Sequence, residues 1–68
     1  MEKWIADAVG LMHINRITNC ELAEKLDVTP EYVSMILNGK KAPAHAEERI
    51  LSAIDELCKE KSNTNQVQ

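Results

Sequence analysis

Two helix-start signals lie eleven residues apart in the middle of this 68-residue chain, and they constrain its fold more than any other feature. The first begins at Thr18 and fits a capping box. In that motif the Thr18 hydroxyl accepts a hydrogen bond from the backbone amide of Glu21, and the Glu21 carboxylate accepts one from the amide of Thr18. The second begins at Thr29, which precedes a proline suited to the first helical position. The spacing predicts helices over residues 19–26 and 30–37, joined by a turn of three residues.

The remaining apolar periodicity predicts two further helices and no strand. An amphipathic stripe predicts a helix over residues 3–14, and Gly10 inside it is expected to mark a close approach of another backbone. The members of this stripe are Trp4, Ile5, Ala8, Val9 and Met12. Gly39, which ends the helix 30–37, suits a left-handed conformation. A longer helix is expected from Ala44 to Lys61, with one apolar face. That face consists of Ile50, Leu51, Ile54, Leu57 and Cys58.

The fold class is therefore all-α, with four short helices, or five if the C-terminal run divides in two. A chain of this length forms one domain, and residues 1–61 are assigned to it. The last seven residues, 62–68, contain one apolar residue and are expected to form a disordered polar tail.

Composition excludes several classes of function. No glycine-rich phosphate loop and no nucleophile with a suitable base is present, so the chain is not expected to be an enzyme or to need a cofactor. The cysteines and histidines lack the spacing of a zinc site, and no metal is expected. No run approaches the roughly 18 apolar residues that span a membrane, and no signal peptide is recognised at the start. We therefore expect a soluble cytoplasmic protein without membrane contact, and one too small for a domain that senses a small-molecule ligand.

The two central helices contain the residues that a steep crossing requires. Helices joined by a three-residue turn cross at about 90–120°, so the facing position must be small, as Ala23 is. Val28 fills the space beneath the crossing, and Val33 and Ile36 hold the second helix in place. The opposite side of that helix is then an outer stripe of Glu31, Ser34, Met35 and Asn38.

Residues 22–39 resemble the helix-turn-helix of the lambda-repressor and Cro-like regulators, the XRE family. The shared pattern is an apolar-Ala pair, an apolar turn residue, a small cap, two apolar residues on the second helix and a closing Asn-Gly pair. The resemblance extends over about residues 3–60. Three positions depart from it. Asp27 replaces the turn glycine, which is tolerable because Asp adopts left-handed conformations readily, and the two helices begin with Asn19 and Pro30 where such repressors often have Gln.

The resemblance implies a lambda-repressor-like domain with its motif at residues 19–38. It implies a sequence-specific transcriptional regulator of phage or mobile-element type that binds double-stranded DNA as a homodimer, with helix 30–37 in the major groove. The residues expected to face base edges are Thr29, Pro30, Glu31, Ser34 and Met35. The residues expected to lie against phosphates are Asn19, Tyr32, Asn38, Lys40 and Lys41.

The charge distribution qualifies this expectation. The formal net charge is −3, yet residues 29–49 contain three basic and three acidic side chains, and the excess acid lies in residues 1–28 and 50–68. A neutral binding segment predicts weak DNA binding by one copy, and the exposed apolar residues of the C-terminal helix are the expected dimer surface. The alternative function is that of a protein-interaction module, an antirepressor or inhibitor that does not bind DNA. The acidic composition and Pro30 favour this alternative, whereas Lys40 and Lys41 favour DNA.

Overall fold

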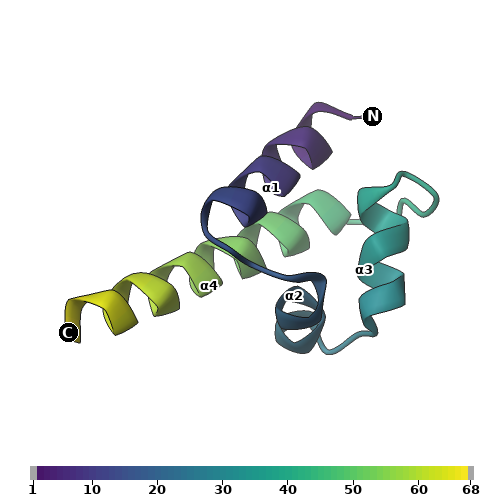
Figure 1. Ribbon diagram of the computed structural model, residues 1–68. Coiled ribbons are helices and arrows are strands. Elements are labelled where there is room, and N and C mark those ends of the chain that lie inside the picture. Colours follow the sequence, from purple (N-terminus) through teal and green to yellow (C-terminus); the bar gives the residue numbers. More distant parts are fainter. Residues whose placement is uncertain (1, 68) are drawn as a thin grey trace.

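The computed structural model describes the backbone of residues 2–67 and the side chains of residues 2–61. It contains α1 (Lys3–Ile14), α2 (Asn19–Leu26), α3 (Pro30–Leu37) and α4 (Ala46–Val67). Helix α4 is the longest element: α1 and α2 both pack on it, and α2 also packs on α3 (Figure 1). The described backbone contains no strand, and the all-α prediction is confirmed.

The bounds of α1, α2 and α3 are those predicted from the sequence. Helix α4 is a single helix, which answers the choice between four and five helices, but it begins two residues later than expected. The reason is His45, whose φ of 62° is left-handed and incompatible with an α-helix. The prediction that α4 ends at Lys61 was wrong, because its backbone continues to Val67 and so covers most of the expected disordered tail at residues 62–68. The side chains of that tail lie outside the described residues.

The core is aliphatic, and all four helices contribute to it. Its largest fully buried side chains are Leu22, Val33, Ile50 and Ile54. Most of the predicted apolar stripe of α1 is buried or half-buried, but Val9 is 41% exposed, so its assignment to the core was wrong. The buried stripe of α1 is narrow because α4 is the main element that packs on it. Leu37, which the sequence reasoning did not place in the core, is buried.

The two glycines have different roles. Gly39 has a φ of +79°, as predicted for the residue that ends α3. The prediction for Gly10 was wrong, because no atom of another described element lies within 4 Å of the position where its Cβ would be. Within one copy, no steric constraint therefore requires a glycine at position 10.

This difference predicts opposite effects of alanine at the two positions. Gly10→Ala should raise the free energy of unfolding by about 0.5–1 kcal/mol, because alanine favours helix and finds open space. Gly39→Ala should lower it by about 1–2 kcal/mol, because an L-residue is strained in the left-handed region. Urea unfolding of both variants at low protein concentration measures the pair. Equal effects would contradict these backbone assignments.

Candidate nucleic-acid interface

Helices α2 and α3 form a tight pair joined by a three-residue turn. The turn begins at Asp27, which has φ 60° and ψ 46° and therefore takes the left-handed conformation that the family's glycine usually takes. The amide of Asp27 donates to the carbonyl of Glu24, and the amide of Val28 donates to the carbonyl of Ala23 over 3.0 Å. Ala23 is buried, as the crossing requires, and Val28 packs against the core. The sequence prediction for this turn is confirmed.

Both helices begin with the predicted caps. The Thr18 hydroxyl accepts from the amide of Glu21 over 3.1 Å, and the Glu21 carboxylate accepts from the amide of Thr18 over 2.9 Å. The hydroxyl of Thr29 accepts from the amide of Tyr32 over 3.1 Å. Each bond satisfies an amide that the first turn of a helix leaves without a partner. The caps thus fix where α2 and α3 start, and with them which side of α3 faces outward.

The outward side of α3 contains the five residues expected to face bases. Four of them, Thr29, Pro30, Glu31 and Met35, are exposed, and Ser34 is half-buried. The side-chain amide of Asn38 donates to the Ser34 hydroxyl over 3.3 Å. Because that hydroxyl already accepts, its proton remains available to a ligand. The structure therefore brings these residues together on one polar surface.

The residues expected to contact phosphates are more dispersed. Lys40 and Lys41 lie directly after α3, and both of their amides donate to the carbonyl of Met35, over 2.9 and 3.2 Å. Both side chains are exposed, and within residues 2–61 neither forms an ion pair. Asn38 is exposed beside them, whereas Asn19 is half-buried at the start of α2. Tyr32 packs against the core and is only partly accessible.

Arg49 also lies near this group. The sequence prediction counted its charge but did not include it among the site residues. Its exposed side chain on the first turns of α4 lines the same hollow as Tyr32 and Pro43, at the edge of α3. Within the described residues it forms no ion pair. No local pattern signals this role, because it depends on how α4 packs beside α3.

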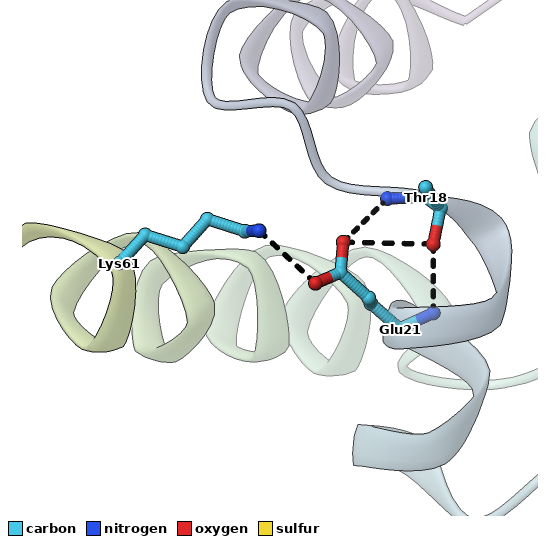
Figure 2. Close-up of polar contacts among 3 residues, drawn as sticks. All are labelled: Thr18, Glu21 and Lys61. Atoms are coloured by element: carbon cyan, nitrogen blue, oxygen red, sulfur yellow. Dashed lines mark hydrogen bonds and ion pairs between the residues drawn. The ribbon is translucent and has the colours of Figure 1, made fainter. Parts of the chain in front are cut away.

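Ion pairs of Lys25 and Lys61 connect α2 with α4. The ammonium group of Lys61 donates to Glu21 over 3.0 Å (Figure 2), and Lys25 contacts both Glu56, over 3.4 Å, and Glu60. The pKa of Glu21 is lowered, chiefly by the hydrogen bond from the Thr18 amide and then by Lys61. The pKa of Lys25 is raised, chiefly by its hydrogen bond to Glu60. Several of the acidic groups are thus paired within the protein, and one of them, Glu56, lines a hollow together with Arg49.

The lowered pKa of Glu21 predicts a pH-dependent contribution to stability. A carboxylate whose pKa falls on folding stabilises the protein above its unfolded pKa, and this contribution disappears as the pH falls through the folded value. Glu21→Gln should therefore be less stable than the wild type at neutral pH, with a gap that narrows between about pH 5 and pH 3.

Urea unfolding at neutral and acidic pH measures this gap. The matched control is Glu24→Gln, one turn along the same helix, where the carboxylate is exposed and forms no ion pair within residues 2–61. The control should show a small gap that does not change with pH. A gap for Glu21→Gln that is also constant with pH would contradict the role given to the carboxylate.

The described residues bear on two further expectations, which concern a membrane span and a dimer surface on α4. None of the helices in this part of the chain combines the length and apolarity needed to cross a membrane. The expected dimer surface on α4 is not available there, because no large apolar side chain of α4 within residues 46–61 is exposed. The large exposed apolar residues are Val9, Leu11, Ile14 and Met35. The apolar face that the sequence predicted on α4 packs into the core of the same chain.

Comparison with known proteins agrees with this geometry. Residues 15–44 match a family model described as Helix-turn-helix, and the matched segment contains α2, the turn, α3 and the two lysines. No match to the chain was found among curated proteins or among solved structures. The caps, the left-handed turn and the outward stripe of α3 occupy the places that the motif requires. Residues 15–44 thus form a helix-turn-helix, a motif typical of DNA-binding regulators.

Proposed function

We propose that this chain is a sequence-specific regulator of transcription that binds double-stranded DNA and reads the major groove with α3. The observation that carries the proposal is the outer stripe of α3, in which Glu31, Met35 and Asn38 are exposed and Ser34 is half-buried. It acts as a small repressor of phage or mobile-element type, in the cytoplasm, without a small-molecule ligand. A major groove about 12 Å wide admits such a helix.

The side chains of the stripe suit base edges in different ways. Glu31 accepts a hydrogen bond from the N4 amine of cytosine, and Pro30 and Met35 offer apolar contact to a thymine methyl group. The Ser34 hydroxyl accepts from Asn38, so its proton is free to be donated to an acceptor on a purine. Thr29 lies at the end of the stripe that enters the groove first.

The lysines after α3 supply the sequence-independent part of the affinity. Lys40 and Lys41 lie against the phosphate backbone together with Asn38, and Asn19 contacts it from the start of α2. Arg49 extends this contact surface past the hollow that it shares with Tyr32. Few phosphates are neutralised by one copy, so binding is weak for a monomer and depends on a homodimer at two half-sites about 34 Å apart.

The acidic balance of the chain is compatible with this proposal. Glu21, Asp55 and Glu56 are paired with lysines of the same chain, over distances of 3.0 to 3.4 Å. Paired charges project a weaker field than isolated ones, and screening at physiological ionic strength limits their reach to about 8 Å. The acid on α2 and α4 therefore reduces the affinity for DNA without abolishing it.

A mobility-shift assay with varied salt tests this function. The purified chain is mixed with genomic fragments, including the region beside its own gene. We expect one or a few fragments to be retarded specifically, with an affinity that falls steeply as salt rises. The absence of any retardation at low salt would overturn the proposal.

Specificity should depend on Ser34. Ser34→Ala removes the donor that faces the groove, so discrimination at one base pair of each half-site should fall by about 1–3 kcal/mol while the salt dependence is unchanged. Selection from randomised duplexes, followed by titration of the selected sites, measures this loss. Ser52→Ala on α4 is the control and should leave the selected sequence intact. A selected sequence that is identical for Ser34→Ala and the wild type would exclude base contact by Ser34.

One observation favours a second function, that of a protein-interaction module. Pro30 presents no hydrogen-bonding side chain at the first position of α3, and Met35 is 39% exposed beside it, as in many protein-binding surfaces. An antirepressor or inhibitor would use this surface against a protein partner. A stable complex with a DNA-binding protein, together with no retardation of any duplex, would favour this alternative.

A further inference from the structure

The outer side of α1 leaves two large apolar side chains exposed. Ile14 is 77% exposed and Leu11 is 42% exposed. Three positions apart on the helix, they lie on one side of it. Gly10 adjoins them and has open space at its Cβ position. We call Gly10, Leu11 and Ile14 the α1 outer face.

We propose that the α1 outer face docks a second copy of this chain, with the two α1 helices antiparallel across a two-fold axis. A two-fold interface brings the same patch of both copies together, so the patch must complement itself. Exposed leucine and isoleucine side chains gain from mutual burial, and the adjoining Gly10 permits a close approach of the two helices.

The charges along α1 favour an antiparallel partner. The first turns contain Glu2 and Asp7 against a single base, Lys3, whereas His13 and Arg16 lie at the other end. Antiparallel pairing places the acidic start of one helix beside the basic end of its partner, while parallel pairing would place like charges together. Within the described residues, neither Asp7 nor Arg16 forms an ion pair with its own chain.

The position of α1 leaves α3 free in such a dimer. Helix α1 packs chiefly on α4 and lies at an edge of the molecule, while α3 packs chiefly on α2 (Figure 1). Pairing through α1 therefore leaves the polar stripe of α3 uncovered. The inference rests on the proposed function for its biological use, because a weak monomeric interface with DNA needs a second copy.

The size of the surface indicates a weak dimer in free solution. A standard stable interface buries about 800 Å² on each partner, and two large apolar side chains supply only part of that area. We expect reversible association that becomes substantial between micromolar and millimolar concentration. Adjacent half-sites on DNA would strengthen it by holding two copies close together.

Sedimentation velocity of the whole chain over that concentration range tests the inference. The mean mass of the wild type should rise from 7.7 kDa toward the value of a dimer. Ile14→Asp should weaken association at least about tenfold, because it places a like charge on both sides of the axis. The control is Val9→Asp, which is 41% exposed on the opposite side of α1 and should associate like the wild type. Circular dichroism of each variant verifies that it is folded.

A charge exchange tests the antiparallel arrangement. Asp7→Arg alone should weaken association, and adding Arg16→Asp should restore it. A wild type that stays monomeric at millimolar concentration, equal effects of Ile14→Asp and Val9→Asp, or no rescue by the exchange would each overturn the inference.

The two proposals can fail separately. Retardation of a random duplex at low salt needs no dimer, so Ile14→Asp should retain it. If retardation persists while the wild type remains monomeric, only the dimer surface is wrong. If the dimer forms while no duplex is retarded, only the proposed function is wrong.

Discussion

The double substitution Lys40→Ala/Lys41→Ala should weaken binding to every DNA sequence by about tenfold or more and flatten its salt dependence. Each phosphate contact contributes about 0.9 to the slope of log K against log salt. Removing two contacts in each copy should therefore lower that slope by close to 2 for a monomer and about twice that for a dimer. The preferred sequence should not change, because phosphate contacts position the protein without reading bases.

The matched control for this experiment is Lys59→Ala. It removes one positive charge from α4, where Lys59 pairs with Asp55 over 3.2 Å, one turn away on the same helix. Fluorescence anisotropy with a labelled duplex over several salt concentrations measures both affinity and slope. The lysines after α3 would be excluded as phosphate contacts if the double variant and Lys59→Ala gave the same slope as the wild type.

Leu22→Ala should unfold most of the population at ordinary temperature. The side chain of Leu22, on α2, is fully buried in the core. Truncating a buried leucine to alanine lowers the free energy of unfolding by about 2–5 kcal/mol. A domain of this length has a free energy of unfolding of only a few kcal/mol, so the loss caused by Leu22→Ala approaches that total. Each kcal/mol should lower the Tm by about 4–8 °C.

Leu11→Ala is the control for this truncation. Leu11 is a helical leucine that is 42% exposed, so at concentrations where the chain is monomeric its truncation should change stability by no more than about 0.5 kcal/mol. Thermal unfolding followed by circular dichroism compares the two variants. A loss of similar size in both would contradict the division between core and surface described above.

The helix-turn-helix could be predicted closely because its determinants are local. The caps at Thr18 and Thr29 and the left-handed residues Asp27 and Gly39 each act through neighbours within a few positions of sequence. Such signals can be recognised without knowing what packs on the helix. The bounds of α2 and α3 therefore agree with the sequence prediction.

The sequence predictions were wrong where the local structure depends on packing between residues that are far apart in the sequence. Periodicity assigned Val9 to the core, but the part of α1 that α4 covers is too narrow to include it. Gly10 faces open space, because no element of the same chain crosses α1 there. The start of α4 depends on the left-handed His45, and the sequence prediction took no account of the enrichment of histidine in that conformation.

The candidate site likewise combines features that depend on local sequence with features that depend on long-range packing. The outer stripe of α3 follows from helical spacing once the buried side is known, and it lies where the sequence indicated. Arg49 could not be found in this way, because its place beside Tyr32 arises from the packing of α4 near α3. The ion pair between Glu21 and Lys61, which are 40 positions apart, likewise had no signal in the sequence.

The central claim is that α3 and the lysines after it form the surface that contacts DNA. Amide chemical-shift mapping tests it most directly, with the isotope-labelled chain titrated with a short duplex cut from a retarded fragment. We predict that the largest changes fall on residues 29–41 and near Asn19, with small changes on residues 50–61 of α4. Changes concentrated on α4 or on the acidic face of α2, with residues 29–41 unaffected, would contradict the account.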